Sequence, residues 1–191
     1  MTGYYYYCWN SELTHEICQK LIKLGEGKWK QAQTFGSQKD NDTLDDVRKS
    51  DIVWIEEQWV YDLIWPYMAS ANEQAGWNYE ITAAESPQLT RYKETGYYTW
   101  HADGIGSHNE VYHEPDNKFR HGNTRKLTMS VILNDDYTAG DLEIFKADNP
   151  LPKLKEGSIV VFPSFLHHRV TPVTEGTRYS LISWFLGPPF K

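Results

Sequence analysis

The sequence PSFLHHRVTPVTEGTRYSLISWFL, residues 163–186, decides the fold of this chain. It holds two runs rich in β-branched and aromatic residues, HRVTPV and TRYSLISWFL, with the turn-forming residues Glu175 and Gly176 at their junction. Five more such runs precede it from residue 79 onward, separated by turn residues: QLTRYK, YYTWH, RKLTMSVIL, DLEIFK and SIVVF. Seven strands in about 110 residues are typical of a double-sheet jelly roll.

Two amphipathic helices are predicted before these strands. Apolar residues recur near helical spacing from Leu13 to Leu24, where Ser11 is the predicted N-cap. A second pattern of this kind runs from Glu56 to Ala75. Pro66 lies inside the second pattern and lacks a backbone donor, so we expect either a kink or two shorter helices there.

The order of the elements predicts the fold class. A surface connection is expected over residues 33–50, and a strand at DIVWI, residues 51–55. Helices that come first and strands that come later are typical of an α+β chain whose helices brace one sheet. We therefore expect a single domain over residues 1–191, α+β but mainly β, with helical support from residues 11–75 and a double-stranded β-helix (jelly roll) core over about residues 79–188.

Composition excludes several classes of protein. Hydrophobic residues make up 40% of the chain and aromatic residues 15%, which is too rich in core formers for a disordered protein. The formal net charge of −7 gives no general attraction to phosphate backbones, so no nucleic-acid partner is expected. No stretch approaches the roughly 20 apolar residues that span a bilayer, so no membrane partner is expected either. With two cysteines and no signal-peptide pattern, we expect a reduced, cytoplasmic protein.

The WHADG motif at residues 100–104 carries the main chemical signal. Side chains two residues apart on a strand point the same way, so His101 and Asp103 can bind one ion together. A distal histidine completes a set of two imidazoles and one carboxylate, which is the ligand set of non-haem Fe(II) sites. Three ligands on one face leave the opposite face open to a co-substrate and dioxygen. His168 is the predicted third ligand, and its neighbour His167 is the alternative.

A cationic residue at a fixed distance supports this reading. If residues 174–176 form a three-residue hairpin loop with Gly176 in the left-handed conformation, Pro172 lies opposite Arg178. His168 is then on the same face as Arg178 and about 13 Å away along the strand. A five-carbon diacid such as 2-oxoglutarate, together with an extended Arg178 side chain, can bridge this gap, because a guanidinium pairs well with the far carboxylate of the diacid.

Two tyrosines precede the first histidine. Tyr92 and Tyr98 lie in strands that should line the same cavity, and either hydroxyl could hydrogen-bond the co-substrate. The alternative for each is an ordinary aromatic residue of a jelly-roll core, since tyrosine favours strands in any case.

Gln88 to Pro188 resembles the prolyl 4-hydroxylase type of Fe(II)/2-oxoglutarate-dependent dioxygenase, which includes bacterial hydroxylases. The resemblance rests on RYxxxGxYxWHAD at 91–103, AGDLEIF at 139–145 and PSxxxHRVTPVTxGxRYSL at 163–181. It implies a double-stranded β-helix, iron held by His101, Asp103 and His168, and 2-oxoglutarate held by Arg178 with help from Tyr92. Ala139 stands where the family usually shows a second glycine.

The resemblance also implies an activity. Such an enzyme hydroxylates a C–H bond and decarboxylates 2-oxoglutarate to succinate, with ascorbate as reductant, and peptidyl proline is the leading substrate. A peptide or protein, proline-containing, would then be the partner, with dioxygen as the second co-substrate. Hydroxylation of another residue or of a free small molecule stays open, as does a non-catalytic metal-binding jelly-roll module.

A long polar segment, residues 104–124, follows the metal motif. Its titratable residues lack strand or helix spacing, so we expect a solvated lid over the site rather than a second metal centre: His108, His113, Glu114, Asp116 and His121.

Overall fold

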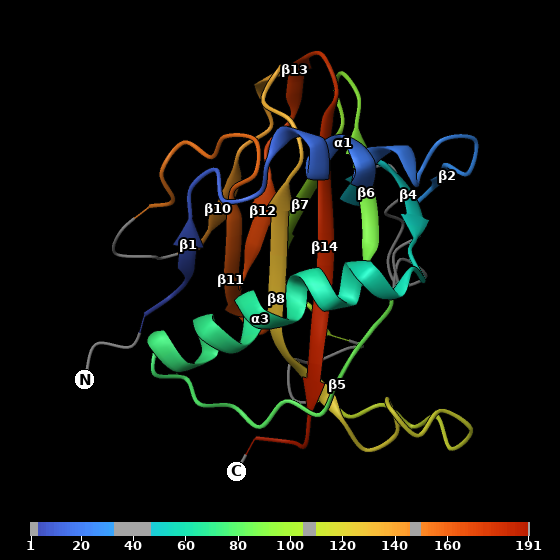
Figure 1. The fold of residues 1–191 in the computed structure, drawn as a ribbon, viewed down its shortest axis with the longest axis vertical. Coiled ribbons are helices and arrows are strands. Elements are labelled where there is room, and N and C mark those ends of the chain that lie inside the picture. Colours follow the sequence, from blue (N-terminus) through green and yellow to red (C-terminus); the bar gives the residue numbers. More distant parts are fainter. Residues whose placement is uncertain (1–3, 33–46, 105–109, 146–149, 191) are drawn as a thin grey trace.

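Strands predominate over helices in the computed structural model, which describes residues 4–32, 47–104, 110–145 and 150–190 (Figure 1). Two helices lie in these ranges, α1 (His15–Lys23) and α3 (Gln58–Gln74). No helix there is long and apolar enough to cross a membrane. The strands are β1 (Tyr7–Trp9), β2 (Lys30–Gln31), β3 (Arg48–Lys49), β4 (Asp51–Trp54), β5 (Ala83–Ala84), β6 (Gln88–Tyr92), β7 (Tyr97–His101), β8 (Thr124–Ile132), β9 (Thr138–Ala139), β10 (Leu142–Ile144), β11 (Ile159–Pro163), β12 (His168–Val170), β13 (Val173–Glu175) and β14 (Arg178–Gly187).

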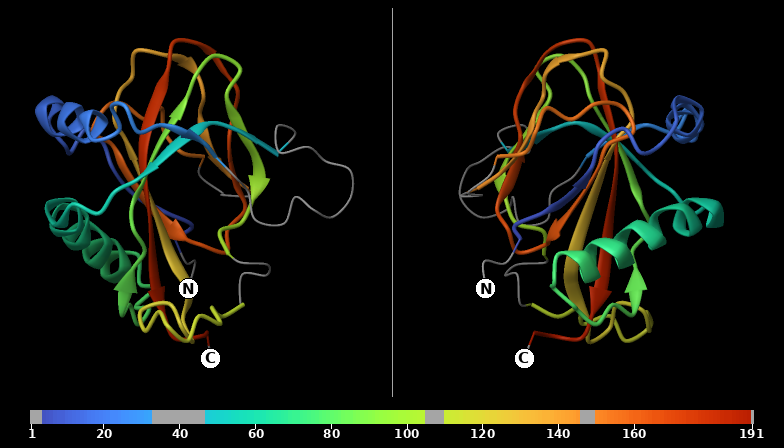
Figure 2. Two further views of the ribbon diagram at one scale, coloured as in Figure 1. Left: turned by 90° about the vertical axis from the view of Figure 1, so that its right-hand side faces the viewer. Right: turned by 60° about the vertical axis from the view of Figure 1, so that its left-hand side comes forward.

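The larger sheet has its strands in the order β1-β11-β8-β14-β6-β4-β2, with β5 added at one end of β14. Both helices pack on its outer face (Figures 1 and 2). Strand β8 shows why both faces are covered. Leu127, Met129 and Val131 are fully buried against the helical layer, whereas Thr128 and Ser130 point the other way and line an internal pocket.

The smaller sheet, β10-β12-β7-β3, faces the inner side of the larger one. A second apolar cluster fills part of the space between the two sheets, with Phe162 from the larger sheet and Leu142 and Val170 from the smaller one. All strand pairs in both sheets are antiparallel. The predicted fold, mainly β with a double-stranded β-helix braced by N-terminal helices, is therefore confirmed.

Several boundaries differ from the sequence prediction. The side chain of Thr14, not Ser11, caps α1 by accepting a hydrogen bond from the Ile17 amide, since Ser11 has a left-handed φ of 51° that suits a turn. Helix α3 continues through Pro66 as one element. Residues 33–46 of the expected surface connection lie outside the described residues. Its end was wrongly assigned, because Arg48 and Lys49 pair with β7 as strand β3.

The predicted hairpin around Gly176 is also wrong. Gly176 has the expected left-handed φ of 79°, but the strands on either side of it enter different sheets. Val173 in β13 pairs with Ala139, and Arg178 at the start of β14 pairs with Tyr92. The ten residues of β14 form long ladders with β6 and β8, which the three residues of β13 could not offer.

The polar segment after the metal motif is anchored at its base. Residues 105–109, including His108, lie outside the described residues, and the exposed His113, Asp116 and His121 are solvated as expected. Tyr112, by contrast, is buried and its hydroxyl donates to Glu85 at 2.8 Å. Arg125 holds the same carboxylate through two hydrogen bonds of 2.7 and 2.8 Å. The segment is therefore attached to the larger sheet through buried polar contacts.

Ala139 yields the first prediction. Its φ of 59° is left-handed, a conformation that costs a non-glycine residue about 1–2 kcal/mol. Glycine also raises the conformational entropy of the unfolded chain, which reduces the gain in stability by about 0.4–1 kcal/mol. Ala139→Gly should therefore raise the free energy of unfolding by about 0.5–1 kcal/mol in urea titrations. As a control, Ala83→Gly in strand β5 should lower it by about as much. Equal losses in the two variants would contradict strain at Ala139.

Candidate metal centre

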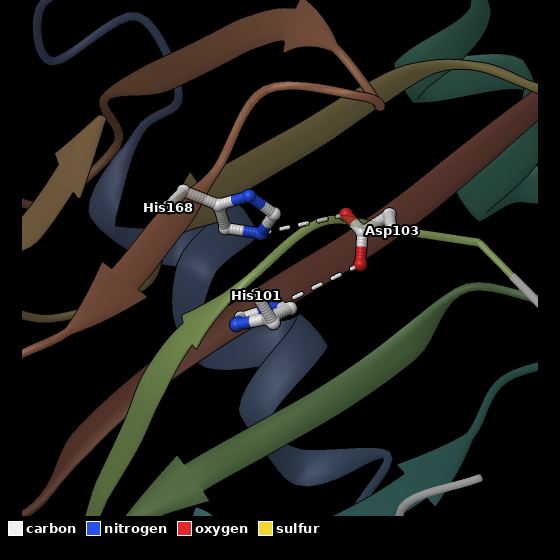
Figure 3. A group of neighbouring side chains, drawn as sticks. All are labelled: His101, Asp103 and His168. Carbon is white, nitrogen blue, oxygen red and sulfur yellow. Dashed lines mark ion pairs between the residues drawn. The ribbon is translucent and has the colours of Figure 1, made fainter. Parts of the chain in front are cut away.

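Three predicted ligands meet between the two sheets, although His168 is far from His101 and Asp103 in the sequence. His101 ends β7, Asp103 follows it, and His168 begins β12 directly opposite His101 (Figure 3). The Nε2 atom of His168 lies 3.5 Å from one Asp103 oxygen, and the Nε2 atom of His101 lies 3.9 Å from the other. The three residues offer ligand atoms that all lie within 4.8 Å of one another. Within the described ranges, no other group of His, Cys, Asp and Glu is so placed.

Both imidazoles are held in the form that binds a metal. The Nδ1 atom of His101 lies 2.8 Å from the Thr99 carbonyl oxygen, and Nδ1 of His168 lies 2.9 Å from that of Leu166. A carbonyl oxygen only accepts, so each Nδ1 donates and each Nε2 presents its lone pair to the centre of the group. Burial, together with the neighbouring His168, lowers the pKa of His101 to about 3, which keeps its ring neutral near pH 7.

Asp103 supplies the negative charge and is itself supported. Burial opposes its ionisation, but the neighbouring imidazoles and Arg125 outweigh this and hold the pKa of the carboxyl below its usual value. The Thr128 hydroxyl donates to Asp103 Oδ2 at 2.7 Å, and the Asp103 amide donates to the Ser164 carbonyl at 2.9 Å. The carboxylate is therefore charged and fixed in orientation.

This donor set fits a divalent transition metal. Imidazole and carboxylate ligands lie about 2.0–2.2 Å from an ion such as zinc, so two ligand atoms can be up to about 4.4 Å apart. The separations of 3.5 and 3.9 Å at Asp103 lie inside this limit. Two histidines and one carboxylate on one face match the ligand set of non-haem Fe(II) sites.

A bulge in β7 explains where Tyr98 lies. His101 pairs with His168 and Tyr98 pairs with Val170, so β7 has one more residue than β12 over this interval. The extra residue turns Tyr98 to the same side as His101, and their rings stack with centroids 3.5 Å apart. Tyr98 thus lines the metal pocket, as expected, through its ring contact with His101.

Arg178 reaches the same pocket from the larger sheet. It is 1% exposed, and its Nη1 atom donates to Ser180 at 3.0 Å, while Nε has no hydrogen-bond partner among the described residues. No described carboxylate forms an ion pair with it. Its cross-strand partner Tyr92 is buried and packs its ring 5.5 Å from the guanidinium. Arg178 is thus a buried cation in the pocket of the histidines.

His167, the alternative to His168 as third ligand, is exposed to solvent and does not line this pocket.

Sequence reasoning missed a second buried cation. Arg48 lines the metal pocket, donates to Ser50 and Gln88 at 2.7 and 2.9 Å, and lies over the ring of Tyr98. A two-residue strand leaves no alternation to detect, so only the pairing of β3 with β7 reveals its place. Sequence reasoning also missed Thr128, because the sequence around it has no feature that distinguishes it from the threonines of other predicted strands.

Comparison with known proteins identifies relatives of this arrangement. The family model described as "2OG-Fe(II) oxygenase superfamily" matches residues 87–186, a little over half of the chain. A PKHD-type hydroxylase of Synechococcus sp. (strain CC9311) is 39% identical over 72 residues. That alignment covers 36% of this chain and 33% of the relative, so the chain matches about a third of the length of this curated protein.

Solved structures share the fold over nearly the whole chain. The viral collagen prolyl hydroxylase of Paramecium Bursaria Chlorella virus-1, solved as its 2OG complex, has a TM-score of 0.69 and 19% identity, and the alignment covers 97% of each chain. A Trichoplax adhaerens prolyl hydroxylase, in complex with a hypoxia inducible factor peptide fragment, has a TM-score of 0.63 and 18% identity over 95% of this chain and 83% of the other. At these identities the likeness concerns the fold.

The support of Asp103 by Thr128 can be tested through metal affinity. Thr128→Val keeps the shape of the side chain but removes the hydroxyl, so the affinity for ferrous iron should fall about 10–100-fold, as it does when ligand-orienting residues are lost. Calorimetric titration without oxygen measures this. Thr90→Val is the matched control, because Thr90 is also buried but its hydroxyl donates to Gln88 and not to a metal ligand, and it should change the affinity less than twofold. Equal affinities in both variants would contradict the role of Thr128.

Proposed function

Since the chain belongs to the 2OG-Fe(II) oxygenase superfamily, we propose that it is an Fe(II)- and 2-oxoglutarate-dependent dioxygenase that hydroxylates a C–H bond. One observation carries this proposal. A pocket between the two sheets contains a set of two imidazoles and one carboxylate, and also the buried guanidinium of Arg178, which has no carboxylate partner among the described residues. A binding module that only held a metal would have no use for a buried cation without an anion.

Each residue has a defined part in this proposal. His101, Asp103 and His168 would hold ferrous iron, which when bound would be chelated by the 2-oxo-acid end of 2-oxoglutarate and would activate dioxygen, the oxidant for hydroxylation. Arg178 binds the far carboxylate of 2-oxoglutarate, which satisfies its buried charge. Tyr92 packs beside this guanidinium, and Tyr98 orients the His101 ring by stacking on it. Each turnover would consume one dioxygen and one 2-oxoglutarate, and would yield one hydroxylated product, one succinate and one carbon dioxide.

Peptidyl proline is the proposed substrate. One relative in fold is a collagen prolyl hydroxylase and another is a prolyl hydroxylase bound to a peptide, which supports a peptide or protein partner for this chain. Ascorbate is the proposed reductant that keeps the iron ferrous between turnovers. We place the metal and 2-oxoglutarate sites in a single domain spanning residues 1–191.

Arg48 favours a second substrate class. Within the described residues this buried guanidinium has no acidic partner, and it lies on the Tyr98 side of the pocket rather than the Arg178 side. A substrate with its own carboxylate, such as a free amino acid, would neutralise it. Blocked proline peptides and free proline therefore distinguish the two classes, since only the free acid carries that charge.

Turnover gives the test of the function. Purified protein is incubated with Fe(II), ascorbate, 2-oxoglutarate and either proline-rich peptides or free proline, and succinate is measured alongside the gain of one oxygen by mass spectrometry. We expect succinate to form with at least one of these substrates and to match the oxygen gained. Complete silence in protein shown to contain iron would favour a non-catalytic metal-binding module.

Two substitutions separate the proposed roles. Asp103→Ala removes the only carboxylate ligand, so ferrous iron should no longer bind measurably. Arg178→Ala removes the partner of the far carboxylate, so the KM for 2-oxoglutarate should rise at least about 30-fold, or roughly 2 kcal/mol, while iron affinity changes less than threefold. Calorimetry with each ligand and steady-state kinetics measure the two effects. Equal losses of iron and 2-oxoglutarate in both variants would contradict the assignment.

A further inference from the structure

A half-exposed tryptophan lies at the rim of the metal pocket. Trp54 is 49% exposed and sits in β4, where its neighbour Val53 packs under the helices. Trp54 therefore points to the opposite face of the larger sheet, the face that lines the pocket. Its cross-strand partner Gln88 is one of the pocket residues. Trp54 thus extends the wall of the pocket toward solvent.

The indole of Trp54 continues an aromatic wall that starts deep in the pocket. Its ring centroid lies 6.1 Å from that of Trp184, which is 7% exposed and lines the pocket. Trp184 is the cross-strand partner of Thr128, and Thr128 bonds to Asp103. The wall therefore runs from solvent at Trp54 to within one residue of the carboxylate ligand.

The inner part of this wall is fixed in place. The Arg125 guanidinium lies 4.1 Å from the centroid of the Trp184 ring, and Glu85 holds that guanidinium through two hydrogen bonds. The indole Nε1 of Trp184 is buried without a hydrogen-bond partner among the described residues. The fixed ring of Trp184, with its available Nε1 donor, and the exposed ring of Trp54 together form a surface suited to bind a ligand.

The spacing of the two rings matches one kind of chain. In an extended peptide, side chains two positions apart point to the same side and lie about 6.4–6.8 Å apart, close to the 6.1 Å between the ring centroids. Two alternate side chains of an extended peptide can therefore pack on the two rings of one wall. Proline rings pack well on indole faces for the same reason that other apolar rings do.

We infer that Trp54 is a specificity-determining residue that binds the peptide substrate outside the metal pocket. The hydroxylated proline lies against Trp184, and the residue two positions away packs on Trp54, with the segment in extended conformation. This inference rests on the proposed function for the identity of the peptide. It predicts that the chain prefers proline or another bulky apolar residue over glycine at that second position.

The variants test peptide binding separately from chemistry. Binding of an end-blocked proline-rich peptide is measured by calorimetry on protein loaded with Mn(II) and 2-oxoglutarate, and steady-state hydroxylation is measured with Fe(II). Trp54→Ala should weaken peptide binding and raise its KM about tenfold, with kcat and the KM for 2-oxoglutarate within twofold of the original values. Trp54→Phe should restore most of the affinity. Trp54 is half-exposed, so both variants should fold, as thermal unfolding will report.

A matched control is available on the other side of the sheet. Trp65 is 37% exposed on α3, but its ring contacts Phe185 on the face covered by the helices. Trp65→Ala should leave peptide binding within twofold of the original.

Changing the peptide locates the contact. Glycine placed two residues before or two residues after the hydroxylated proline should, on one of the two sides, weaken binding to the original protein about tenfold. The same change should weaken binding to Trp54→Ala less than twofold, because the contact is already lost. Unchanged peptide binding in Trp54→Ala, with hydroxylation intact, would overturn the inference and leave the function standing. Peptide binding that depends on Trp54, in protein that hydroxylates no peptide, would support the inference and contradict the proposed function.

Discussion

The pairing of β12 with β7 is the constraint on which the site depends. This short ladder puts His168 directly opposite His101, and a bulge beside it brings Tyr98 onto the same face. The two histidines are thereby positioned by backbone hydrogen bonds rather than by flexible loops, and each ring is further fixed by a bond from Nδ1 to a carbonyl two residues earlier. A slip of one residue in this register would turn His168 away from Asp103 and leave no group of ligands.

The larger sheet offsets the free-energy cost of this arrangement, because its two faces bury different kinds of side chain. Alternate residues of β8 and β14 send apolar side chains toward α1 and α3, where most of the buried core lies. The intervening positions send Thr128, Ser130 and Arg178 toward the metal pocket. Buried polar and charged groups, which cost free energy without partners, therefore gather on one face, and the helices stabilise the sheet from the other.

Much of this could be predicted from the sequence, and the failures have physical causes. The runs of β-branched and aromatic residues located β6, β7, β8, β10, β11, β12 and β14, and the apolar period located α3, because local patterning determines both. Sheet pairing could not be read in this way. The turn at Gly176 suggested a hairpin, whereas long-range ladders place β13 and β14 in different sheets. Arg48 and Thr128 were missed because only tertiary contacts distinguish them from other strand residues.

The central claim is that His101, Asp103 and His168 hold one ion, with the far carboxylate of 2-oxoglutarate on Arg178. A crystal structure grown without oxygen from protein loaded with Mn(II) and 2-oxoglutarate tests it most directly, because anomalous scattering locates the metal. The account predicts one ion bonded to both Nε2 atoms and to an Asp103 oxygen, with 2-oxoglutarate reaching from that ion to the Arg178 guanidinium. An ion bound elsewhere, or a 2-oxoglutarate whose far carboxylate lies on Arg48, would contradict it.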